Sequence, residues 1–340
     1  MPARLSEVFR AHPVHLHDTN IEFESVRELP DSHAWPLVID YPSEDMYDIE
    51  AVPIIDLMDP NATNLVGNAC ERWGVFQVTN HGIPIGLLED VESEGRRLFQ
   101  LPAQQKLKAA RPPNGISGYG RARINAFFPK LMWSEGFTIV GSPVEDARQL
   151  WPQEYNTFWK RIKERSLKNE SEGASAALQL NSYPPCPEPK RAMGLAAHTD
   201  STLLTVLYQN STSGLQVLKD GVRWVSVPPR SGTLVVNVGD LLHILSNGRF
   251  LSVLHRAVVH RTRHRLSLAY LYGPPSNIQI APLSKLIDQK HPPLYHPVTW
   301  SEYLGRKAKH FNKALSTVRL CGPQNVFIDM NDQNRMKVEW

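Results

Sequence analysis

The stretch Gly194-Leu-Ala-Ala-His198-Thr-Asp200-Ser-Thr-Leu-Leu204 places an imidazole and a carboxylate two residues apart, just before an apolar run. In an extended segment, residues i and i+2 point to the same face, so His198 and Asp200 can both reach one metal ion. A second histidine follows downstream, in Ser252-Val-Leu-His255-Arg-Ala-Val-Val259. A His-x-Asp pair alone has little weight because chance could nearly supply one in this composition. The surrounding sequence therefore has to decide whether this pair binds a metal ion.

These residues lie in a part of the chain that reads as short strands separated by turn signals. The predicted strands span residues 202–208, 215–218, 224–227, 232–238, 252–259 and 266–272, with turns at Asp220-Gly221 and Ser246-Asn-Gly248. Strands of this length and spacing predict a sandwich, a jelly roll or a barrel.

The rest of the chain mixes helices with a few strands. Helical patterns cover residues 62–73, 87–101, 149–178 and 299–315, and strand patterns cover 52–57 and 74–80. Residues 111–140 are too irregular for one element and hold an aromatic cluster, which is core in most proteins but could also line a site for a large apolar substrate. Residues 1–50 contain His12, His15 and His17, and a solvated arm is favoured there over a metal site.

Composition excludes several classes of protein. The chain has 340 residues, of which 41% are hydrophobic and 21% charged, and its net charge of +3 is too small to indicate a nucleic acid or membrane partner. Cys70, Cys186 and Cys321 lie far apart, which argues against a disulfide framework or a thiolate zinc site. No signal peptide or spanning segment is apparent, so we expect a cytoplasmic protein.

In a β-rich fold the three candidate ligands can meet at one metal ion. In a double-sheet barrel, the strand that follows His198 and Asp200 can face the later strand that holds His255. Two histidines and one carboxylate with open coordination positions are the usual ligands of non-haem Fe(II) in oxygenases. Three ligands leave part of the iron coordination shell free for a chelating cosubstrate and dioxygen.

A second pair, Arg265 and Ser267, shares one face of a predicted strand. An inward guanidinium in an apolar barrel is costly unless it meets an anion, and its planar fork fits a carboxylate. The alternative is an exposed arginine in a basic patch with Arg261 and Arg263. A third pair, Asn181 and Tyr183, follows the same spacing and could add hydrogen bonds at the same site.

Together these motifs resemble the signature of the plant 2-oxoglutarate- and Fe(II)-dependent dioxygenases, over roughly residues 50–318. The matching segments are Val52-Pro-Ile-Ile-Asp-Leu57, Trp73-Gly-Val-Phe-Gln-Val-Thr-Asn-His-Gly82, Asn181-x-Tyr183-Pro-Pro, His198-x-Asp200, Asn237-Val-Gly-Asp240, Ser246-Asn-Gly248, His255-Arg256 and Arg265-x-Ser267. The resemblance implies a mixed α and β fold with a double-stranded β-helix (jelly roll, cupin-like) core flanked by helices. It also implies four parts in one compact unit: an extension (1–50), a mostly helical amino-terminal region (51–175), the jelly-roll domain with a carboxy-terminal helix (176–318) and a tail (319–340).

The resemblance assigns roles to the candidate residues. It implies that His198, Asp200 and His255 bind Fe(II), and that Arg265 and Ser267 hold the distal carboxylate of 2-oxoglutarate with support from Tyr183 and Asn181. The expected reaction consumes O2 and releases succinate and CO2. It yields a ferryl oxidant that hydroxylates an unactivated C–H bond, with ascorbate as reductant.

Within that family the chain is most similar to the gibberellin 3-beta-hydroxylases, through segments such as Ser117-Gly-Tyr-Gly120 and Lys130-Leu-Met-Trp-Ser-Glu-Gly-Phe-Thr-Ile-Val-Gly-Ser-Pro143. This similarity implies 3β-hydroxylation of a gibberellin precursor by a protein that we expect to be monomeric. The expected substrate residues are Tyr119, Arg123, Phe127 and Trp133. Two alternatives remain open: a gibberellin oxidase acting at the 2-, 20- or 1-position, and a non-catalytic small-molecule-binding cupin protein.

Overall fold

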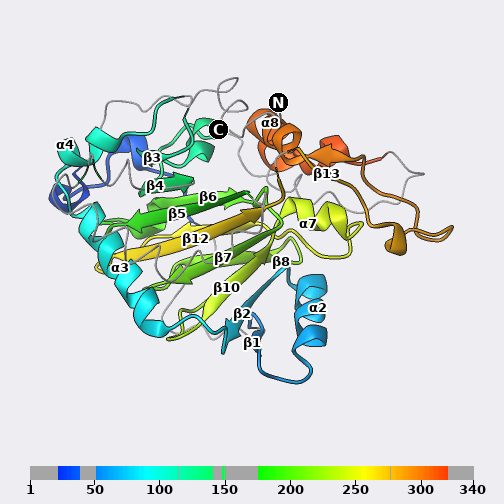
Figure 1. Ribbon diagram of the computed structural model, residues 1–340. Helices are drawn as coiled ribbons and strands as arrows, with labels where there is room; N and C mark the ends of the chain where they lie inside the picture. Colours follow the sequence, from blue (N-terminus) through cyan, green and yellow to red (C-terminus); the bar gives the residue numbers. More distant parts are fainter. Residues whose placement is uncertain are drawn as a thin grey trace.

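Two β-sheets form the core of the computed structural model, which describes residues 22–38, 51–113, 115–140, 148, 150, 175–275 and 277–320. Eight strands form the larger sheet in the order β1-β2-β10-β7-β12-β5-β4-β3 (Figure 1). Four strands form the smaller sheet in the order β6-β11-β8-β9. The strands are β1 (Ile54–Asp56), β2 (Val75–Thr79), β3 (Gly118–Gly120), β4 (Glu135–Val140), β5 (Ser175–Tyr183), β6 (Met193–His198), β7 (Leu204–Gln209), β8 (Leu215–Lys219), β9 (Arg223–Ser226), β10 (Leu234–Val238), β11 (His255–Val258) and β12 (Arg265–Gly273), followed by the separate pair β13 (Gln279–Ile280) and β14 (Val298–Thr299).

The chain crosses repeatedly between the two sheets from β5 onward. β5, β7, β10 and β12 belong to the larger sheet, whereas β6, β8, β9 and β11 belong to the smaller one. All pairings among these eight strands are antiparallel. This alternation defines a double-stranded β-helix and confirms the predicted fold class.

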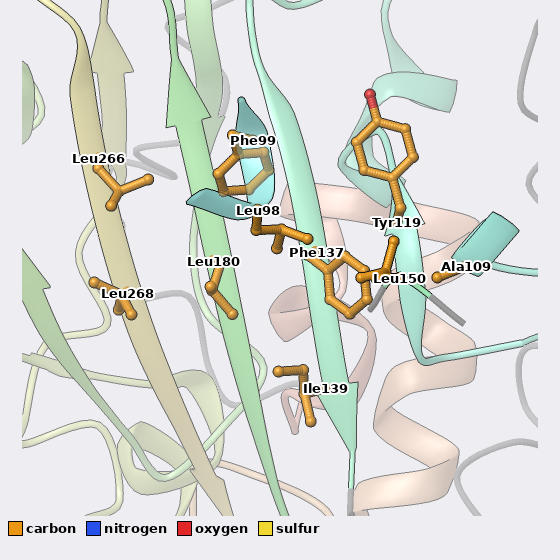
Figure 2. Packing of buried hydrophobic residues seen from close by; sticks show 10 residues of the cluster. All are labelled: Leu98, Phe99, Ala109, Tyr119, Phe137, Ile139, Leu150, Leu180, Leu266 and Leu268. Carbon is orange, nitrogen blue, oxygen red and sulfur yellow. The ribbon is translucent and has the colours of Figure 1, made fainter. Parts of the chain in front are cut away.

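Side chains alternate along each strand of the larger sheet, and the face that α3 covers is apolar. Leu266 and Leu268 of β12 pack with Leu180 of β5 on the apolar face (Figure 2). The complete cluster consists of Leu98, Phe99, Ala109, Tyr119, Phe137, Ile139, Leu150, Leu180, Leu266 and Leu268. Helix α3 (Ile85–Phe99) approaches this face so closely that a Cβ at Gly95 would lie 3.1 Å from Leu266 Cδ2. The opposite face contributes Val75, Leu207, Val235 and Ala269 to a second apolar cluster with the smaller sheet, and it also carries buried polar side chains such as Ser267.

Helices surround the two sheets. Besides α3, the described elements include the helices α2 (Ala62–Arg72), α4 (Ala103–Lys106), α7 (Asp240–Leu245) and α8 (Trp300–His310), with 3-10 turns η1 (Phe23–Ser25), η2 (Asp31–His33), η3 (Leu107–Ala109), η4 (Arg123–Phe127), η5 (Pro189–Arg191), η6 (Ser284–Leu286), η7 (Phe311–Lys313) and η8 (Leu315–Val318). Thr299 and Glu302 form a capping box that begins α8. In the part of the chain that is described, no helix is long and apolar enough to cross a membrane.

The structure differs from the sequence expectation in three local features. Residues 175–178, predicted to end a long helix, belong to β5, because β12 supplies a nine-residue antiparallel partner. The remainder of that predicted helix lies almost entirely outside the described residues. Strand β6 and helix α7 were not predicted, and the irregular segment contributes β4 to the larger sheet.

Part of the amino-terminal extension packs on the core rather than standing in solvent. The Trp35 amide donates to the Arg191 carbonyl and the Val38 amide to the Lys190 carbonyl, each at 2.8 Å. Leu29 is buried. The prediction of a solvated arm was therefore wrong for residues 22–38, while His12, His15 and His17 lie outside the described residues.

Candidate active site

A cavity of about 720 Å³ opens between the two sheets. Its walls include the inward-facing side chains of β5, β7, β11 and β12, together with residues of η4 and α8. The alternation along β12 is visible in this wall, since Arg265, Ser267 and Ala269 line the cavity while Leu266 and Leu268 face the apolar cluster.

The three predicted metal ligands meet in this cavity. Strand β11 pairs with β6 so that His255 lies opposite His198. The Nε2 atoms of both histidines lie 3.6 Å from Asp200 Oδ1. One ligand atom from each residue falls within 4.8 Å of the others, a spacing that suits three donors to one ion.

Both histidines are held with Nε2 facing the carboxylate. His198 Nδ1 lies 2.8 Å from the Ala196 carbonyl oxygen, and His255 Nδ1 lies 3.3 Å from the Val253 carbonyl oxygen. A carbonyl oxygen can only accept, so each Nδ1 carries the proton and each Nε2 presents its lone pair. This backbone support is typical of metal-binding histidines.

The charge state of the cluster also suits a cation. Burial and the neighbouring His255 lower the pKa of His198 to about 4, so the ring is neutral at pH 7. Burial raises the pKa of Asp200, but the two histidines and the Thr205 hydroxyl lower it by more. Thr205 Oγ1 donates to Asp200 Oδ2 at 2.6 Å, which leaves Oδ1 directed at the histidines. Neutral imidazoles and an ionised carboxylate are the forms that bind metal.

Arg265 is a buried cation in the same cavity, with an exposed fraction of 1%. It donates to Gln209 Oε1 at 3.1 Å and to Ser267 Oγ at 3.5 Å, and it lies over the Tyr183 ring at 4.9 Å. Its buried Nε atom has no hydrogen-bond partner. No carboxylate of the described residues forms an ion pair with it. A buried guanidinium with a donor to spare is well suited to bind an anionic ligand.

The neighbouring strand completes this part of the wall. Antiparallel pairing of β12 with β5 places Tyr183 opposite Arg265 and Asn181 opposite Ser267. All four residues line the cavity. The predicted cosubstrate residues are thus brought together with the metal ligands, and the alternative of Arg265 as an exposed strand arginine does not hold.

The four predicted substrate residues divide into two groups. Arg123 and Phe127, both in η4, line the cavity. Tyr119 and Trp133 are absent from the described residues that line it. Tyr119 belongs to the apolar cluster (Figure 2). Its hydroxyl donates to Glu135.

Trp133 is completely buried in a different apolar cluster, which includes Leu29 and Cys186. Its ring contacts Phe23 and His33 of the amino-terminal extension at centroid distances of 4.8 Å and 5.6 Å. The expectation that Tyr119 and Trp133 form the substrate wall is therefore corrected: both anchor the core, as aromatic clusters usually do.

Sequence reasoning missed part of the cavity wall. Arg111 is 7% exposed and lines the cavity, and its guanidinium donates to Thr138 Oγ1 and to the Arg121 carbonyl oxygen. Phe311 stacks on Phe127 with ring centroids 4.7 Å apart. No local pattern marks these residues, because the contacts that place them at the cavity come from distant parts of the chain.

Comparisons with known proteins agree with this geometry. The model of the 2OG-Fe(II) oxygenase superfamily matches residues 174–274, and the model described as non-haem dioxygenase in morphine synthesis N-terminal matches residues 52–161. Among solved structures, JOX2 in complex with 2OG, Fe and JA is 30% identical with a TM-score of 0.71, covering 90% of this chain and 96% of that one. The dioxygenase for auxin oxidation of rice is 26% identical with a TM-score of 0.64, covering 79% and 100% of the two chains.

Curated relatives cover the whole chain. Gibberellin 3-beta-dioxygenase 1 of Pisum sativum is 55% identical over 100% of both chains. Gibberellin 3-beta-dioxygenase 1 of Arabidopsis thaliana is 54% identical over 94% of this chain and 99% of its own. The chain therefore belongs to the 2OG-Fe(II) oxygenase superfamily and, within it, to the gibberellin 3-beta-dioxygenases.

Proposed function

We propose that this protein hydroxylates gibberellin precursors at the 3β position, with Fe(II) as cofactor and 2-oxoglutarate and O2 as cosubstrates. The observation that carries the proposal is the presence, in one cavity, of a two-histidine, one-carboxylate cluster and a buried arginine with an unused donor. The names of the full-length relatives supply the substrate class.

The metal would be held by His198 Nε2, Asp200 Oδ1 and His255 Nε2. When bound, iron supplies with 2-oxoglutarate and O2 the oxidising power that replaces a C–H hydrogen with hydroxyl, with succinate and CO2 as coproducts. Arg265 and Ser267 donate hydrogen bonds to the distal carboxylate of 2-oxoglutarate, and Tyr183 and Asn181 support them from β5. Ascorbate would serve as reductant.

The substrate carboxylate needs a cation of its own. Five cationic side chains are found among the described residues that line the cavity: Arg111, Arg123, Arg256, Arg265 and Lys307. Lys307 is paired with Asp240, Arg256 stacks on Trp224, and Arg265 serves the cosubstrate. Arg111 and Arg123, which line the cavity and donate to backbone carbonyls, are our candidates for the substrate carboxylate.

Burial disfavours the charged forms of both arginines, and the charge of Arg111 adds to this effect at Arg123. Burial, and then the charge of Arg111, lowers the pKa of Arg123 to about 10. Burial lowers the pKa of Arg111 to about 10 as well. A carboxylate bound between two buried guanidinium groups would relieve both effects, while the stacked rings of Phe127 and Phe311 provide an apolar wall for the polycyclic skeleton.

The reaction is tested by incubating the full-length protein with Fe(II), 2-oxoglutarate, ascorbate and single gibberellin precursors. We expect a 3β-hydroxylated product and succinate in proportion, identified by mass spectrometry against standards. Hydroxylation at another carbon would show that the protein is a related gibberellin oxidase and not a 3β-hydroxylase. Gibberellin binding without succinate release would indicate a non-catalytic binding protein.

Arg265→Ala should raise the 2-oxoglutarate concentration needed for half-maximal rate about 30-fold or more, because it removes a buried charged partner worth about 2 kcal/mol or more. Fe(II) affinity should stay nearly unchanged. Arg261→Ala, which removes an exposed arginine nearby, is the matched control. Unchanged cosubstrate affinity in Arg265→Ala would remove this residue from the site.

Arg111→Ala and Arg123→Ala should each raise the substrate KM about tenfold, the loss expected for one charge-assisted hydrogen bond. Each variant should also lose the preference of the wild type for the free acid over its methyl ester. Lys108→Ala, at an exposed position, controls for general loss of positive charge. A variant that keeps the wild-type KM and acid preference would show that its arginine does not bind the carboxylate.

We further propose that the protein acts as a monomer in the cytoplasm. In support, one chain supplies every residue of the site described above. Cys70 and Cys186 are buried free thiols whose pKa burial raises to about 11, as suits cysteines kept reduced. Light scattering after gel filtration should give a mass near 38.4 kDa, and a mass twice as large would contradict the monomer.

A further inference from the structure

Asp240, the first residue of α7, is completely buried and accepts hydrogen bonds from side chains of three separate segments. Ser252 Oγ donates to its Oδ1 at 2.6 Å. Thr199 Oγ1, Tyr303 OH and Lys307 Nζ donate to its Oδ2 at 3.1 Å, 2.8 Å and 2.9 Å. We refer to these five residues as the Asp240 network.

The first of these segments contains two iron ligands. Thr199 lies between His198 and Asp200, and the backbone amide of Asp240 donates to the Asp200 carbonyl at 2.7 Å. The approach is so close that a Cβ at Gly239 would lie 2.1 Å from the Thr202 carbonyl oxygen. The start of α7 therefore fixes the loop that holds His198 and Asp200.

The second segment precedes the third iron ligand. Ser252 lies three residues before His255, in the stretch that leads from α7 into β11. Its hydrogen bond to Asp240 thus holds the segment before His255. The same carboxylate also holds the loop with His198 and Asp200.

The third segment is α8, which forms part of the wall of the substrate cavity. Lys307 of α8 lines the cavity, as do Leu304 and Ala308 of the same helix and Phe311 just after it. Lys307 Nζ also reaches Thr199 Oγ1 at 2.5 Å. The ion pair between partly buried Lys307 and buried Asp240 therefore connects α8 with the loop that holds His198 and Asp200.

We propose that Asp240 is a positioning residue, which fixes the α8 wall relative to His198, Asp200 and His255 and so determines which substrate C–H bond faces the iron. Two carboxylate oxygens accept four hydrogen bonds here, which an amide with a single acceptor oxygen cannot do. Removing Lys307 leaves the buried Asp240 carboxylate without its counter-ion, and neutralising Asp240 leaves Lys307 without its ion-pair partner. The substrate part of this inference rests on the proposed gibberellin hydroxylation, whereas the metal part does not.

The test compares Asp240→Asn and Lys307→Met with the wild type in the full-length chain. Fe(II) affinity is titrated without substrate, and hydroxylated gibberellin is then counted per succinate released. Asp240→Asn should lower Fe(II) affinity about tenfold or more, the effect typical of losing support behind metal ligands. Lys307→Met should lower hydroxylated product per succinate about tenfold, because the shifted wall misplaces the substrate while Arg265 still binds the cosubstrate.

The control is Lys309→Met, which changes an exposed lysine of the same helix and should leave both quantities unchanged. If Asp240→Asn and Lys307→Met lose only thermal stability and keep both quantities at wild-type values per folded molecule, the proposal is overturned. Should either fail to fold, Tyr303→Phe removes one donor and keeps both charges. A smaller decrease in both quantities is then expected, and unchanged values would again overturn the proposal.

The two proposals can fail separately. A wild-type protein that hydroxylates no gibberellin would refute the proposed function. The Fe(II) titration of Asp240→Asn would still decide whether Asp240 positions the metal ligands.

Discussion

The pairing of β11 with β6 is the contact on which the site depends. It sets His255 opposite His198 at the end of β6, and Asp200 follows in the loop that leads to β7, where its carboxylate meets both histidines. A shift of one residue in this register would turn His255 away from the cavity. The irregular register just after His255 shows that the ladder is adjusted locally while the histidine pair is kept.

The alternation of side chains along β12 places core residues on one face of the strand and cavity residues on the other. Leu266 and Leu268 contribute to the apolar cluster beneath α3, while Arg265 and Ser267 on the same strand face the cavity. A buried arginine without a carboxylate partner costs stability. A rigid scaffold with a well-packed opposite face can tolerate that cost, which the proposed 2-oxoglutarate carboxylate would offset when it binds.

Local spacing explains what could be predicted from the sequence. The Arg-x-Ser and Asn-x-Tyr pairs follow from strand geometry, so the shared face of each pair was predictable. The jelly-roll class came from the resemblance to the dioxygenase family, since the strand spacing left a sandwich, a jelly roll or a barrel open. Asp200 meets the histidines from a loop just beyond β6, which strand periodicity does not explain. Tyr119 and Trp133 were placed wrongly because an irregular aromatic segment does not reveal which rings face the core. The pairing of Lys307 with Asp240 joins residues 67 positions apart, and no local pattern indicates such contacts.

The most direct test of the central claim is anaerobic crystallography of the protein with Fe(II) and 2-oxoglutarate, using anomalous diffraction at the iron edge. The account predicts one iron peak bonded to His198 Nε2, Asp200 and His255 Nε2, with the distal carboxylate of 2-oxoglutarate on Arg265 and Ser267. An iron peak away from these three residues, or a cosubstrate carboxylate that does not contact Arg265, would contradict it.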